Sequence, residues 1–166
     1  DGEVYTQTGS AGPLKVDIRI SHDGRQALAR TLPVTGGITE MKASPNGKEI
    51  AVVFRGEIFV CSVEGVVTKR VTNTPAQERS VSFSPDGRTL VYAAEKDNNW
   101  NVYTTSIVRK EEPYFYASTV LKEDPLVATP AEEFQPEFSP DGKEVAYLEN
   151  RVVLKVITLI SKETRT

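Results

Sequence analysis

The residues that most metal and redox sites require are nearly missing from this chain of 166 residues, which has one cysteine and one histidine. Neither a disulfide within the chain nor a cysteine–histidine zinc cluster can form from so few ligands. Cys61 lies in the apolar run 58–61, where a buried, inert thiol is expected. The Asp-Gly pairs lack the alternating carboxylates of a calcium loop, and no glycine-rich phosphate loop occurs. We therefore expect no cofactor and no metal.

An excess of positive charge and a long hydrophobic run are absent as well. Against 20 lysines and arginines stand 23 aspartates and glutamates, so no basic field attracts phosphates and nucleic acid is not an expected partner. No apolar run approaches the roughly 20 residues that cross a bilayer, so membrane insertion is not expected. Residues 1–5 show neither a Met nor a signal-peptide pattern, and we expect the chain to be part of a longer protein.

Sets of residues that could form a catalytic site are also scarce. His22 is flanked by Ser21 and Asp23, but neighbouring residues of a turn point in different directions, so this trio is interpreted as turn composition and not as a catalytic triad. The Gly-x-Ser-x-Gly turn of the α/β-hydrolases does not occur. We expect this segment to have no enzymatic activity of its own.

What the chain does have is a repeat. A Ser-Pro-(Asp/Asn)-Gly motif occurs three times, each time followed by a polar residue or two and then an apolar run. The first two copies are 40 residues apart, the length of one propeller blade, and the next two are 55 apart. The motif residues are Ser44, Pro45, Asn46, Gly47, Ser84, Pro85, Asp86, Gly87, Ser139, Pro140, Asp141 and Gly142.

The motif has the chemistry of a tight turn between two strands. Proline presets the first corner, Asp or Asn bonds back to the local backbone, and glycine accepts a positive φ. We therefore predict an all-β partial β-propeller of four-stranded antiparallel blades, about three blades' worth of strands from a probable six-bladed ring. The predicted division is the last strands of a preceding blade (1–37), two blades (38–75 and 76–130, the second with an insertion) and an incomplete blade (131–166).

Two blocks carry a family resemblance. Residues 83–92, FSPDGRTLVY, and 138–147, FSPDGKEVAY, resemble the WD-type repeats of TolB propellers and tricorn-like proteases. Residues 43–52 with 55–59, ASPNGKEIAV and RGEIF, are similar to the first propeller of tricorn-like peptidases. The similarity reaches nearly the whole chain. The insertion between the second and third motifs departs from the simple pattern, and nothing here resembles a peptidase or PDZ-like region.

The tricorn resemblance implies a propeller that filters or channels peptides to a serine peptidase core. We therefore expect a non-catalytic scaffold that binds a peptide or protein, or gates a substrate, and that contacts the rest of its parent propeller and the peptidase core. The alternative is a TolB-like envelope propeller that binds proteins and has no enzyme attached. Both families favour an extracytoplasmic or periplasmic location. A segment of a propeller exposes sheet faces and edges that the rest of the ring would cover, so self-association of the segment is also possible.

Candidate binding residues lie at the entry to the first strand of two blades. Glu78 and Arg79 occupy this place in one blade, and Glu132 and Glu133 in the next. In propellers this strand lines the channel, so these charges could meet a ligand. A solvated strand entry is the alternative.

Two aromatic candidates complete the set. Trp100, on the hairpin that begins at Lys96, is either an anchor for a partner or packing against the adjacent blade. Tyr114, Phe115 and Tyr116 in the insertion cannot all face inward on a strand of period two. They predict either a contact surface or a crowded edge between two sheets.

Overall fold

The computed structural model describes residues 4–17 and 33–166, and the chain divides into two units, Asp1–Val34 and Thr35–Thr166. In the first unit, β1 (Tyr5–Thr6) and β2 (Leu14–Lys15) pair as an antiparallel hairpin. The trio around His22 lies outside the described residues.

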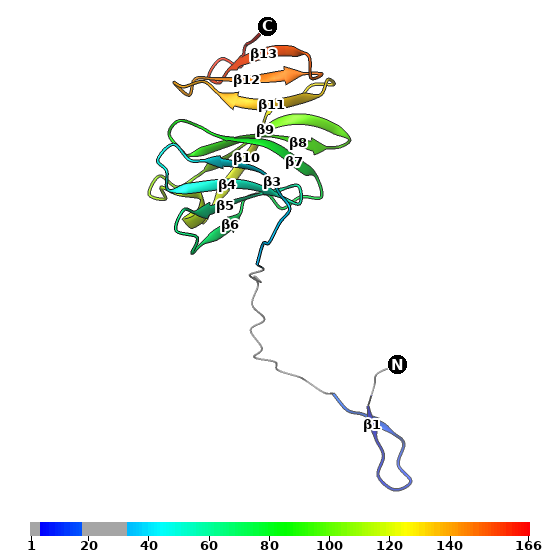
Figure 1. Cartoon of the computed structure of the whole chain (residues 1–166). Coiled ribbons are helices and arrows are strands. Elements are labelled where there is room, and N and C mark those ends of the chain that lie inside the picture. The colour runs from blue at the N-terminus through cyan, green and yellow to red at the C-terminus, as the bar shows by residue number, and fades with distance from the viewer. Residues whose placement is uncertain (1–3, 18–32) are drawn as a thin grey trace. The chain divides into compact units, whose positions relative to one another are not determined.

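The second unit consists of three four-stranded antiparallel sheets, each with its strands in chain order. They stack face to face in the order of the sequence (Figure 1), and we name them blades 1, 2 and 3. This confirms the all-β partial propeller. Blade 1 contains β3 (Ile38–Ala43), β4 (Glu49–Phe54), β5 (Glu57–Ser62) and β6 (Thr68–Arg70). Blade 2 contains β7 (Gln77–Phe83), β8 (Thr89–Lys96), β9 (Asn99–Ile107) and β10 (Leu121–Val127). Blade 3 contains β11 (Glu133–Phe138), β12 (Glu144–Glu149), β13 (Val153–Thr158) and β14 (Thr164–Arg165).

The third blade differs from the expected incomplete one, because a fourth strand is present. It is only two residues long and pairs Thr164 and Arg165 with β13. The six-bladed ring and the blade boundaries remain predictions.

The core lies in two layers between the blades. Side chains alternate along each strand, so Ala51 and Val53 of β4 face blade 2 and meet Leu90 and Tyr92 of β8. Val91, between these two, faces the other way into the layer shared with blade 3. Leu90 to Ala94 are all fully buried, because blade 2 has a neighbour on each face. Each blade is thus stabilised mainly by burial against its neighbours.

The Ser-Pro-(Asp/Asn)-Gly motifs join the first two strands of each blade, and their side chains close the turns. In blade 2, Ser84 Oγ donates to Asp86 Oδ1 at 2.6 Å and accepts from the Thr89 N–H at 2.9 Å, while the Gly87 N–H donates to the Ser84 carbonyl. Asp86 Oδ1 also accepts from the Arg88 N–H. The same bonds recur at Ser44, Asn46, Gly47, Lys48 and Glu49, and at Ser139, Asp141, Gly142, Lys143 and Glu144.

Two of these glycines allow a matched test of the turn. Gly47 and Gly142 have φ of 67° and 70°, so alanine is strained at either by about 1 kcal/mol. A Cβ at Gly142 would also lie 3.3 Å from Pro85 Cδ, whereas one at Gly47 meets nothing within 4 Å. Gly142→Ala is therefore expected to destabilise the chain more than Gly47→Ala in urea unfolding. Equal losses would show that the turn of blade 3 does not pack on that of blade 2.

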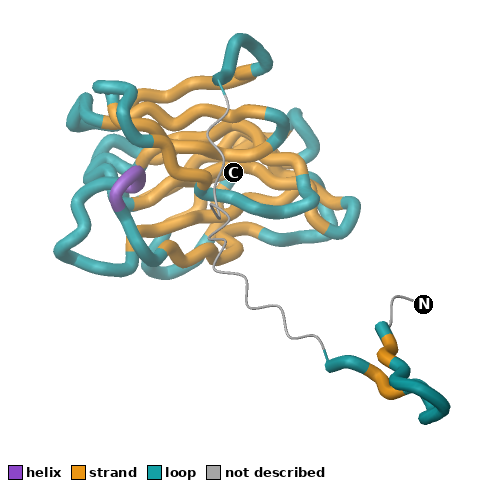
Figure 2. Tube along the Cα trace, turned by 90° about the horizontal axis from the view of Figure 1, so that it is seen from below, coloured by secondary structure: helices purple, strands orange, loops and turns teal. Residues whose placement is uncertain are grey.

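The insertion of blade 2, residues 108–120, forms a strap that contacts β5 and β6 of blade 1. It contains the one short helix of the described part, η1 (Phe115–Ala117), drawn in purple in Figure 2. Phe115 is fully buried and meets Phe83 edge to face at 6.0 Å. The Tyr116 N–H donates to Glu49 Oε1, and Lys69 Nζ donates to the Ser118 carbonyl. For Phe115, the crowded edge between two sheets is therefore what the structure shows. In the described residues, no helix is long and apolar enough to cross a membrane.

Candidate functional site

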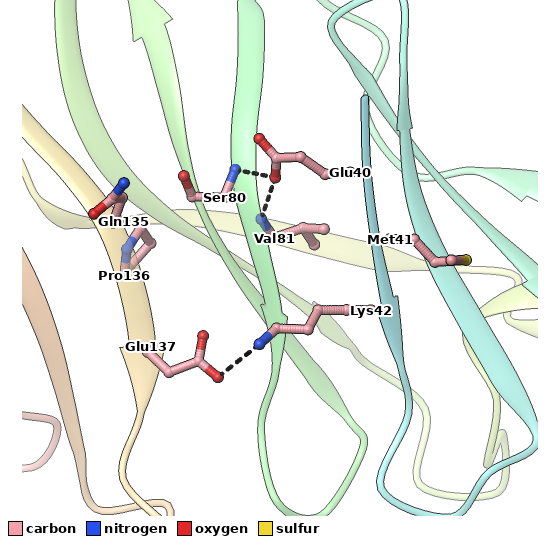
Figure 3. Close-up of a pocket in the computed structure, with 8 residues that line it drawn as sticks. All are labelled: Glu40, Met41, Lys42, Ser80, Val81, Gln135, Pro136 and Glu137. Atoms are coloured by element: carbon pink, nitrogen blue, oxygen red, sulfur yellow. Dashed lines mark hydrogen bonds and ion pairs between the residues drawn. The ribbon is translucent and has the colours of Figure 1, made fainter. Parts of the chain in front are cut away.

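The first strands of the three blades together line a cavity of about 350 Å³ (Figure 3). Polar side chains and backbone make up most of its lining, with one proline, one valine and one methionine. The lining residues are Glu40, Met41 and Lys42 of β3, Ser80 and Val81 of β7, and Gln135, Pro136 and Glu137 of β11. We call this surface the inner wall.

A β-bulge shapes the wall in both β7 and β11. The register shifts between Arg79 and Ser82 in one strand and between Phe134 and Glu137 in the other. Ser80 and Gln135 take the same position in the two bulges, with φ of 57° and 49°. Such a bulge leaves backbone groups without a partner in the ladder.

Glu40 supplies the missing partner in β7. Its Oε2 accepts from the Ser80 N–H at 2.5 Å and from the Val81 N–H at 3.4 Å. Figure 3 shows Glu40 and Lys42 pointing from β3 toward β7, while Met41 points the other way. Lys42 Nζ reaches Glu137 of blade 3 at 3.1 Å, so one ion pair links the two outer blades along the wall.

These two contacts of β3 are expected to differ in their effect on stability. Glu40→Ala leaves half-buried N–H groups of the bulge without an acceptor, which costs about 1–3 kcal/mol. Lys42→Ala removes an ion pair whose side chains are about half exposed, and such pairs contribute about 0–1 kcal/mol. Urea unfolding of the two variants measures the difference. A larger loss for Lys42→Ala would contradict the role given to Glu40.

Glu78 and Glu133, predicted at strand entries where they could meet a ligand, do not line the inner wall. Both are fully buried. Each closes a loop in a Thr-Pro-Ala-x-Glu sequence by accepting a hydrogen bond from its threonine, Thr74 or Thr129. The alternative of a solvated strand entry is wrong for them, because burial between the blades gives these carboxyls a structural role.

The Thr72 hydroxyl bridges two carboxyl groups, those of Glu57 and Glu78. The Thr72 hydroxyl accepts from the Ile58 N–H and lies 2.8 Å from Glu57 Oε2 and 3.0 Å from Glu78 Oε2. A hydroxyl has one proton to donate, so one of the two carboxyl contacts needs a proton of its own. Glu57 Oε1 also accepts from the Arg70 guanidinium at 2.6 Å. Burial, opposed by the threonine bonds and reinforced by Glu57, raises the pKa of Glu78.

Glu133 and Glu49 are buried carboxyls of the same kind. Burial raises the pKa of both. Within the described residues, Oε2 of each has no hydrogen-bond partner. For Glu133 the reason is visible in the repeat, because Val127 stands where Thr72 stands in the preceding loop.

Trp100 packs against the adjacent blade, the second of its two predicted roles. It is 8% exposed and lies 5.3 Å from the Phe134 ring. Arg79 is exposed and its guanidinium covers Trp100, while Glu132 is half-buried at the start of blade 3 and its N–H donates to Asn150. Tyr114 and Tyr116 are half-buried and stack on each other at 5.2 Å. Ligand binding by these residues remains a prediction.

Sequence reasoning missed Arg55, Arg151 and Phe134. Arg55 and Arg151 lie in the hairpins between the second and third strands, and each covers an aromatic ring. The signal that the sequence offered is an arginine in the same turn of two blades. In the part of the chain that the structure describes, no group of three His, Cys, Asp or Glu side chains could hold a metal ion. Cys61 is half-buried, and its thiol lies 3.5 Å from the Ile50 carbonyl.

Comparison with solved structures identifies similar propellers. A TolB of Agrobacterium tumefaciens matches 99% of this chain with 20% identity and a TM-score of 0.60, and TolB from Acinetobacter baumannii matches 77% with 17% identity and a TM-score of 0.59. The tricorn protease matches 76% with 20% identity and a TM-score of 0.57. The chain spans 54%, 31% and 14% of those proteins, respectively. No protein-family model and no curated protein matches the chain. At these identities the similarity establishes a TolB-like propeller fold.

Proposed function

We propose that the chain is a non-catalytic propeller segment that binds a protein or peptide. The observation that supports this most directly is the inner wall, where three first strands present one polar surface with exposed Lys42, Gln135 and Glu137. Polar groups on a rigid sheet provide specificity at low ordering cost. The buried acids Glu78 and Glu133, which have raised pKa values, lie between the blades and not on this wall.

For the parent protein we propose a TolB-like propeller of extracytoplasmic location. The extent of the match supports it, because the TolB of Agrobacterium tumefaciens aligns with almost the whole chain. A peptide-gating propeller of a tricorn-like serine peptidase is the second candidate, supported by the match to the tricorn protease over 76% of the chain. The reading frame of the parent gene beyond Thr166 discriminates between them. A hydrolase core with a serine nucleophile would favour the gating propeller, and only further repeats would favour the TolB-like one.

Binding at the inner wall can be tested with peptides selected from a random display library on the purified chain. Gln135→Arg places a larger, charged side chain on the wall at a position that already tolerates positive φ. We expect this variant to bind a selected peptide with at least tenfold lower affinity, measured by calorimetry. Thr68→Arg, an exposed change on the outer strand β6, is the charge-matched control and should leave affinity within twofold. Equal affinities for both variants would reject the wall as the binding surface.

A further inference from the structure

Three exposed arginines lie over aromatic rings instead of pairing with acids. Arg55 covers Phe54 at 5.2 Å, Arg79 covers Trp100 at 5.6 Å, and Arg151 covers Phe134 at 4.4 Å. Among the described residues, none of these arginines forms an ion pair, although Arg79 donates to the amide oxygen of Gln77. Stacking holds a guanidinium in place while leaving donors on its edge free, so little ordering cost remains for an anion that binds there.

Topology places the three arginines at one end of the blades. Arg55 and Arg151 belong to the turns that join the second and third strands of blades 1 and 3. Arg79 is the third residue of β7, at the same end of blade 2 as Trp100, the second residue of β9. All three therefore lie opposite the Ser-Pro-(Asp/Asn)-Gly turns. We call this set the arginine rim.

A cavity of about 350 Å³ opens between two members of the rim. Arg55 and Arg79 line it together with Gly37, Thr39, Val53, Gly56, Gln77 and two acids, Glu40 and Glu78. Neither acid forms an ion pair with Arg55 or Arg79. Glu40 Oε2 is occupied by N–H groups of β7, and Glu78 is bonded to Thr72 and Thr74. The cavity thus offers two guanidinium groups and room for a carboxylate.

We propose that the arginine rim binds an acidic segment of a partner protein. One carboxylate enters the cavity between Arg55 and Arg79, and the segment continues across the edge of blade 3 past Phe134 to Arg151. This rests on the proposed binding function and specifies the chemistry of the partner. Glu95, Asp97 and Glu132 belong to the same end of the blades, so recognition depends on the positions of the arginines more than on net charge.

Fluorescence anisotropy with a fluorescein-labelled hexaglutamate peptide tests the proposal on the chain of residues 1–166. We expect saturable binding that weakens at least tenfold in Arg55→Gln/Arg79→Gln and severalfold in Arg151→Gln. Arg55→Lys/Arg79→Lys retains the charge but loses the planar donors, and it should also weaken binding. Lys110→Gln/Lys143→Gln removes two exposed charges at the opposite end and should change the affinity less than twofold. Urea midpoints check that each variant is folded.

Several results would overturn the proposal. One is the absence of saturable hexaglutamate binding by the unmodified chain. Another is equal weakening in Arg55→Gln/Arg79→Gln and in Lys110→Gln/Lys143→Gln. The third is that a hexalysine peptide or an oligouridylate binds as tightly as hexaglutamate. If hexaglutamate fails to bind while a library-selected peptide still depends on Gln135, the arginine rim is rejected and the inner wall stands. If neither binds, the proposed binding function itself fails.

Discussion

Replacing Phe115 with alanine is expected to lower the free energy of unfolding by about 3–5 kcal/mol, the range for a fully buried phenylalanine. Its ring lies in the layer between blades 1 and 2, against Phe83. The strap has few other ways to fill that space, because the residues beside Phe115 are only half-buried. Equilibrium urea unfolding, followed by tryptophan fluorescence and by circular dichroism, measures the loss.

Tyr114→Ala is the matched control in the same strap. Tyr114 is half-buried and stacks on Tyr116 at the surface, so its removal is expected to cost about 1 kcal/mol. A similar loss for both variants would show that the strap contributes as a whole and that Phe115 does not anchor it. Phe115→Leu, which keeps most of the apolar volume, should recover a large part of the stability.

Stability toward urea is expected to decrease as the pH rises from about 5 to 8. Burial raises the pKa of Glu49, Glu78 and Glu133 above the ordinary glutamate value of 4.5. Above pH 4.5 the folded chain therefore retains protons that the unfolded chain has released. The stability that these groups contribute is complete below 4.5 and is lost as the pH rises through their folded pKa values. Each carboxyl contributes a slope of at most about 1.4 kcal/mol per pH unit.

Other carboxyls limit this trend on the acid side. Hydrogen bonds from Thr119, Ser139 and Arg165 lower the pKa values of Glu112, Asp141 and Glu144, respectively. Their contribution is present above the ordinary pKa values of glutamate and aspartate, 4.5 and 3.8, and is lost as the pH falls. Maximum stability is therefore expected just above pH 4.5.

A triple variant isolates the buried acids. Glu49→Gln/Glu78→Gln/Glu133→Gln keeps the shape but cannot ionise, so its urea midpoint should vary much less between pH 5 and 8. The control carries Glu64→Gln, Glu95→Gln and Glu111→Gln, all at exposed positions, and should retain the slope of the unmodified chain. An unmodified chain that is equally stable at pH 5 and 8 would contradict the raised pKa values of these three acids. The charged groups that face these acids are Glu57 and Lys96 at Glu78, and Glu149 and Lys155 at Glu133.

The candidate site was only partly predictable because burial on a propeller strand depends on the next blade. The sequence marks Glu78 and Glu133 as charged residues at strand entries, but it does not show that Thr74 and Thr129 bond to them. It also marks Trp100, but the Phe134 ring on which Trp100 packs belongs to the next blade. The bulges place Ser80 and Gln135 at positive φ, and because neither residue is a glycine, the sequence does not predict this conformation.

The amino-acid sequence alone determined the all-β class, the three turns and their order along the chain. Serine, proline, aspartate and glycine bond within a few residues of one another, so local chemistry suffices there. Only the tertiary structure decided which polar groups are buried, how Glu40 satisfies the bulge of β7, and that three arginines lie at one end of the blades. Those contacts join residues about 20 to 95 positions apart, and no local pattern specifies a distance across two sheets.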